Sequence, residues 1–174
     1  LSKQTASRAF CRCPKRGTLQ PSNSNFIGYL VGQGATDASY SNFIGSSAGA
    51  QATNAISSNF IGQNAGRSAT NANDSIFLGI EAGNGATTAA AANFICSFAG
   101  YQATNASGSN FIGGGAGYQA SGANGSNFFG VNTGQQATNA SNSNFIGGSA
   151  GLTATNANNS NFIGGSAGNA ATNA

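Results

Sequence analysis

The sequence predicts an all-β protein, a parallel β-solenoid of nine coils, and three observations lead to this prediction. Phenylalanine recurs every seventeen residues in nine successive units, with no insertion or deletion. Glycine follows each of these phenylalanines by six residues, and alanine follows by nine and again by twelve. Fixed spacing over many units is typical of a solenoid, in which each repeat forms one coil. Because ordinary loops tolerate changes of length, no part of the coil is expected to be a free loop.

Each coil is expected to contain one short strand at its Asn-Phe-Ile triplet. Aromatic and β-branched residues suit a pleated surface, whereas repeats rich in Gly, Asn, Ser and Thr disfavour helix. Stacking at about 4.8 Å per coil predicts a rod about 43 Å long. The phenylalanines should form a single ladder in a narrow core: Phe26, Phe43, Phe60, Phe77, Phe94, Phe111, Phe128, Phe145 and Phe162.

The repeated small residues predict corners and inward positions. Glycine also stands two residues after the phenylalanine in eight of the nine units, and Cys96 replaces it in the other. A glycine at a fixed place predicts positive φ or a close backbone approach, and a fixed alanine predicts an inward position with room for one methyl group. Cys96 should therefore carry strain of about 1–3 kcal/mol.

Asparagine precedes the phenylalanine in eight of the nine units, with Ile76 as the exception, and recurs later in the coil, as at Asn54, Asn105 and Asn156. Identical amides one coil apart can form hydrogen-bonded ladders, as in cross-β stacks. The alternative is a row of polar ligands for sugar or ice, and we favour the structural interpretation.

The residue after each phenylalanine is large and apolar. Adjacent residues on a strand point to opposite faces, so an inward phenylalanine leaves this second column pointing outward. The alternative is a strand that bends at the following glycine and turns both side chains inward. A soluble monomer rarely leaves so long an apolar stripe exposed, so another copy of the chain is expected to cover it. This self-association column comprises Ile27, Ile44, Ile61, Leu78, Ile95, Ile112, Phe129, Ile146 and Ile163.

Two regions are expected: an irregular basic segment, residues 1–22, that lies outside the repeat register, and the repeat solenoid, residues 23–174. The first is expected to form a cap or a connector between subunits. Five of the six Lys and Arg residues lie in the first sixteen positions, and Arg67 against Asp37, Asp74 and Glu81 leaves the repeats at 1 − 3 = −2. Nucleic-acid binding needs basic residues along the repeats, so no nucleic-acid partner is expected. No transmembrane segment is expected either, because no run approaches about 18 apolar residues.

The chain lacks the residues of a catalytic centre, so we expect no enzyme, no cofactor and no metal site. Histidine is absent, and three scattered acids do not make a repeated calcium site. The odd number of cysteines, Cys11, Cys13 and Cys96, leaves at least one thiol free or bonded to another chain. Five asparagines lie in Asn-x-Ser triplets and are candidates for N-glycosylation in a host that carries it out: Asn73, Asn105, Asn124, Asn139 and Asn158.

The Asn-Phe-Ile-Gly-x-x-Ala-Gly pattern with its Thr-Asn-rich return, over residues 24–174, resembles the head repeats of trimeric autotransporter adhesins. It is also similar to repeat regions of bacterial and phage tail-fibre-like proteins. The resemblance implies left-handed coils and three chains that associate along their apolar strands. The unit of seventeen residues is longer than that of the adhesin heads.

These patterns predict a structural protein, the self-assembling subunit of an extracellular or cell-surface filament. The chain reaches Ala174 still in phase, which favours growth from end to end. One alternative is an adhesin or receptor-binding fibre that recognises a cell surface or a glycan. A second is an ice-binding solenoid with a threonine row that Ser121 interrupts: Thr36, Thr53, Thr70, Thr87, Thr104, Thr138, Thr155 and Thr172.

Overall fold

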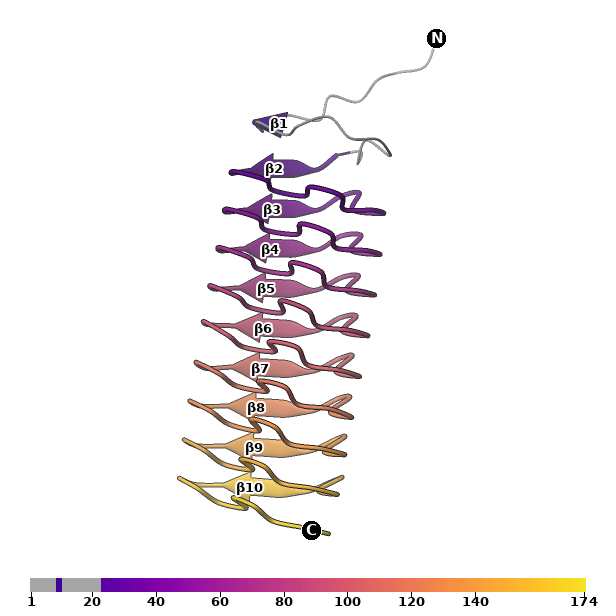
Figure 1. Ribbon diagram of the computed structural model, residues 1–174. Helices are drawn as coiled ribbons and strands as arrows, with labels where there is room; N and C mark the ends of the chain where they lie inside the picture. Colours follow the sequence, from indigo (N-terminus) through magenta and orange to yellow (C-terminus); the bar gives the residue numbers. More distant parts are fainter. Residues whose placement is uncertain (1–8, 11–22) are drawn as a thin grey trace.

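The computed structural model describes residues 9–10 and 23–174, which form a parallel β-solenoid without a helix in those residues. Ten short strands stack in chain order as one parallel sheet along the rod (Figure 1). The all-β solenoid predicted from the seventeen-residue period is therefore confirmed. The strands are β1 (Ala9–Phe10), β2 (Asn25–Ile27), β3 (Asn42–Ile44), β4 (Asn59–Ile61), β5 (Ile76–Leu78), β6 (Asn93–Ile95), β7 (Asn110–Ile112), β8 (Asn127–Phe129), β9 (Asn144–Ile146) and β10 (Asn161–Ile163).

Neighbouring strands pair with an offset of seventeen residues, which is the period of the sequence. Phe26 pairs with Phe43, Phe43 with Phe60, and each later strand pairs with the next at the same offset of seventeen residues. A second row of parallel bridges runs from Thr53 to Thr172 through Ser121, again one coil per step. Each repeat is thus one complete coil, and every coil between the two ends is hydrogen-bonded to the coils on both sides.

Strand β1 extends this register into the basic segment. Ala9 pairs with Phe26 and Phe10 with Ile27, so both lie seventeen residues before their partners. The expectation that residues 1–22 lie outside the register is wrong for these two residues. The five basic residues of the segment, together with Cys11 and Cys13, lie outside the described residues, and the predicted role as cap or connector stays a prediction.

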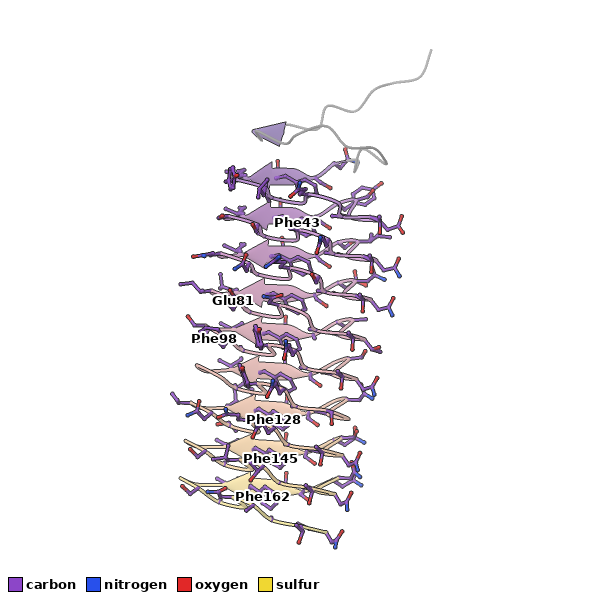
Figure 2. The ribbon with its side chains drawn as sticks, in the orientation of Figure 1. Phe43, Glu81, Phe98, Phe128, Phe145 and Phe162 are labelled. Atoms are coloured by element: carbon purple, nitrogen blue, oxygen red, sulfur yellow. The ribbon has the colours of Figure 1, made fainter. Side chains whose placement is uncertain are left out.

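The core is one phenylalanine wide. The rings from Phe43 to Phe145 are fully buried, and those of Phe26 and Phe162 in the end coils are partly buried against them. Neighbouring rings stack with centroids 4.6–4.8 Å apart, and Figure 2 shows them as a single central ladder. Buried alanines five, nine and twelve residues after most of the phenylalanines fill the remaining space.

Non-glycine residues hold several of the corners in the left-handed region. Eleven residues after the phenylalanine, Asn54, Asn71 and Asn156 have φ of 48°, 49° and 50°. Asparagine is among the residues that adopt this conformation most readily. The asparagine-rich return of the repeat is therefore a backbone requirement as well as a source of side-chain ladders.

A column of serines, two residues before eight of the nine phenylalanines, joins successive coils from inside. Ser41 Oγ donates to the carbonyl oxygen of Ala55 at 2.6 Å and accepts the N–H of Ser58 at 3.1 Å. Ser58 repeats the arrangement with Ala72 and Ser75. These hydroxyls are buried, and within the described residues no buried side-chain nitrogen or oxygen lacks a partner. The column holds the coils together without any charge.

Candidate functional site

The column of apolar residues that follow the phenylalanines lies on the outer face of the sheet. In most strands the middle phenylalanine is buried while its two neighbours are not, so phenylalanine points inward and isoleucine points outward. Ile44, Ile61, Ile95 and Ile112 are half-buried between their neighbours along the column. The exposed members are Ile27, Leu78, Phe129, Ile146 and Ile163, and Leu78 and Ile146 are each 41% exposed. The two side chains do not both turn inward.

This face carries no charge. None of the strand residues from β2 to β10 is charged. The face is richest in aliphatic side chains at β5, where Ile76 takes the usual asparagine position and both Ile76 and Leu78 are exposed. The result is an uncharged stripe that runs the length of the solenoid.

An asparagine ladder lies beside the apolar column on the same face, two residues earlier on each strand. Asn25 Nδ2 donates to Asn42 Oδ1 at 2.7 Å, and Asn42 donates to Asn59 in the same way. Ile76 interrupts the ladder, which continues from Asn93 to Asn161. Because each amide bonds to the next along the rod, part of its hydrogen-bonding capacity is met within the chain. This lowers the cost of covering the face with another surface.

The threonine row occupies a separate column of the coil. Its members from Thr36 to Thr155 are half-buried, and each is followed by an outward residue of positive φ. The alanine before each of them is buried, except Ala35, which is partly buried. Asn54 donates to Asn71 at 2.8 Å, and Asn139 donates to Asn156 at 2.9 Å, in the column next to the row. The threonines therefore make a row one side chain wide.

The predicted glycosylation sites take part in contacts between coils. Asn73, Asn124 and Asn158 each accept a backbone N–H from the preceding coil through Oδ1, at 2.9, 3.0 and 2.9 Å. Asn139 belongs to the ladder described above, and Asn105 is exposed. Glycosylation of these residues stays a prediction.

Cys96 holds the corner that glycine holds in the other coils. Its φ is 103°, whereas the glycines of this column have φ of 123–144°. The thiol is exposed and free. Within residues 9–10 and 23–174, no helix is long and apolar enough to cross a membrane.

An aromatic cluster that the sequence patterns did not single out lies on the coils of β6 and β7. The rings of Tyr101 and Tyr118 stack with centroids 5.0 Å apart, and Phe98 meets Tyr101 edge-on at 5.9 Å. Other repeats carry Gln, Ala, Arg, Asn or Leu where these tyrosines stand. This break in the repeat is the signal that could have found the cluster.

The fold defines this chain as a parallel β-solenoid built of seventeen-residue coils. A scan against protein-family models and a search of curated proteins find no match to it.

Proposed function

We propose that the chain is a structural protein that associates with copies of itself, through the outer face of its sheet, into an extracellular fibre or filament. The observation that carries this proposal is the continuous outward apolar column on a sheet face without charge. A column that spans nine coils is larger than the scattered apolar side chains usual on a monomer surface.

The regular pitch of the face supports a second copy as its partner. Side chains of one kind repeat at one coil per step, with backbones in register along the whole rod. Two such faces have the same spacing, so the apolar rows can interdigitate along their length as in a steric zipper. A partner with another pitch would match at only a few points.

The absence of charge supports the same partner. Charged side chains are the usual means by which proteins prevent association of sheets. After Glu81 the sequence contains no Lys, Arg, Asp or Glu. Two copies brought together along these coils therefore meet no repulsion between like charges. The extracellular location rests on the resemblance of the repeats to surface adhesin heads.

Sedimentation velocity of the purified full chain over a range of concentrations tests the proposal, with electron microscopy of the same samples. We expect large species that grow with concentration, and elongated particles in the images. A single monomeric species at every concentration, with the isoleucine column exposed to solvent, would contradict it.

A further inference from the structure

The aromatic cluster borders a hollow in the surface of the rod. The hollow has a volume of about 480 Å³ and spans three coils, those that begin at β6, β7 and β8. Phe98 lies on the first coil, Gly114, Gly115 and Tyr118 on the second, and Val131, Asn132 and Gln135 on the third. We call this hollow the aromatic notch. In Figure 2, Phe98 lies at the rim of the rod, away from the phenylalanine ladder of the core.

The notch exists because the middle coil lacks two side chains. A β-carbon on Gly114 would meet no atom within 4 Å, and one on Gly115 would meet Asn132 Oδ1 at 2.7 Å. The floor is therefore bare backbone, and the amide of Asn132 leans over it. Six of the other eight coils carry a side chain at both positions, such as Gln63 and Asn64, and the last two coils have glycine only at the first of them.

The chemistry of the walls favours a neutral ligand with both apolar and hydroxylated parts. Phe98 is 43% exposed and offers a face for stacking. Tyr118 is half-buried, stacks on Tyr101 and is tilted by 59° against Phe98 with centroids 6.5 Å apart, so it offers an edge beside that face. The amides of Asn132 and Gln135 stand at the edge, where they can donate and accept hydrogen bonds. The nearest charge along the column of Phe98 is Glu81, one coil earlier, and its two carboxylate oxygens accept from Asn64 and Asn84.

We propose that the aromatic notch binds a neutral hexose unit of a glycan. One of its C–H faces would stack against Phe98 beside the edge of Tyr118, and its hydroxyl groups would bond to Asn132 and Gln135. Binding sites of this kind combine an apolar lining with a few polar groups that fix orientation. The site is separate from the apolar column and does not depend on self-association.

Saturation-transfer NMR on the full chain tests the proposal, because it detects weak binding and works with large assemblies. The probes are a β-1,4-linked glucose hexamer and its N-acetylglucosamine counterpart. We expect signal transfer to at least one probe, reduced about fivefold in Phe98→Ala, as the loss of one stacked ring implies, and also reduced in Tyr118→Ala, which removes the adjoining edge. The matched control is Tyr29→Ala, which removes another exposed ring, and it should leave the transfer unchanged.

A variant that fills the notch tests whether binding needs the open space as well as the two aromatic rings. Gly114→Gln places a side chain found at the same position in another coil into open space, so the coil should fold normally. It should abolish transfer although both rings remain. Equal transfer in all variants would overturn the proposal. No transfer to either sugar, with sedimentation altered by Phe98→Ala and Tyr118→Ala, would also overturn it and assign the notch to contacts between protein chains.

Discussion

The ring of Phe43 occupies the space that a side chain on Gly49 would need. A β-carbon on Gly49 would lie 2.3 Å from Cδ2 of that ring, and φ of Gly49 is 62°. The same contact recurs in the other coils, for example between Phe94 and Gly100. Because each coil wraps around a single ring, the backbone six residues later must pass directly over it. The core is therefore too thin to accept even one additional methyl group there.

Substitution of these glycines should strongly destabilise the protein. Three glycines in different surroundings allow the effect of ring contact to be separated from that of backbone strain. In Gly100→Ala the new β-carbon would lie 2.2 Å from Phe94 Cδ2, at φ of 63°. Left-handed strain of about 1–2 kcal/mol and overpacking of about 1–3 kcal/mol then add. We expect the free energy of unfolding, measured by chemical denaturation, to fall by about 3 kcal/mol.

Two glycines with open space around the position that a β-carbon would take, Gly108 and Gly114, are the controls. Gly108→Ala meets no atom within 4 Å but has φ of 66°, so it should cost only the backbone strain. Gly114→Ala meets no atom and has no positive φ, so it should be close to neutral. Equal effects at all three positions would show that ring contact does not determine the conserved spacing within the repeat.

Replacing Cys96 by glycine should stabilise the protein by about 1–3 kcal/mol, because the corner holds a non-glycine residue at φ of 103°. Thermal unfolding of Cys96→Gly under reducing conditions measures the effect. The reverse change one coil later, Gly113→Cys, should destabilise, since its β-carbon would lie 2.3 Å from the carbonyl oxygen of Gly130. A marked loss of stability in Cys96→Gly would instead assign the cysteine a packing or disulfide role.

Removing a hydroxyl group from the buried serine column should destabilise the protein, and adding one should stabilise it. Ser58→Ala removes the donor to Ala72 and the acceptor of the Ser75 N–H, which should cost about 1–3 kcal/mol. Ala92 stands in this column where most coils have serine. Ala92→Ser restores a hydroxyl between coils and should stabilise the chain by about 1 kcal/mol. Denaturation of both variants beside the wild type checks the pair, and a destabilised Ala92→Ser would contradict the proposed role of the column.

The fold could be predicted because one spacing carries most of its information. The distance from one phenylalanine to the next sets the register, and alternation along a strand separates inward Phe60 from outward Ile61. The serine column was harder to recognise, since serine is common at exposed turns as well as inside this core. Ala9 and Phe10 share the register of β2, but alanine stands where the other coils have the core phenylalanine, so the spacing of the phenylalanines did not mark them.

The aromatic notch escaped sequence analysis for a different reason. Phe98, Tyr118 and Gly115 belong to two coils, and their significance lies in departing from the repeat. Periodic patterns identify what all coils share, such as the core and the apolar column. The notch occurs once and depends on three residues that differ from the repeat pattern. These residues come together only in the folded, stacked coils.

Association through the apolar column is the central claim, and sedimentation of matched lysine variants tests it most directly. Ile61→Lys with Ile112→Lys places two charges in the column, where the long side chains can reach water without unfolding the coil. Gln51→Lys with Gln102→Lys adds the same charge at exposed positions in a different column. Circular dichroism should show that both variants keep the wild-type fold. We predict that the isoleucine variant sediments as a monomer while the glutamine variant assembles like the wild type. Assembly of the isoleucine variant to the wild-type extent would contradict the claim.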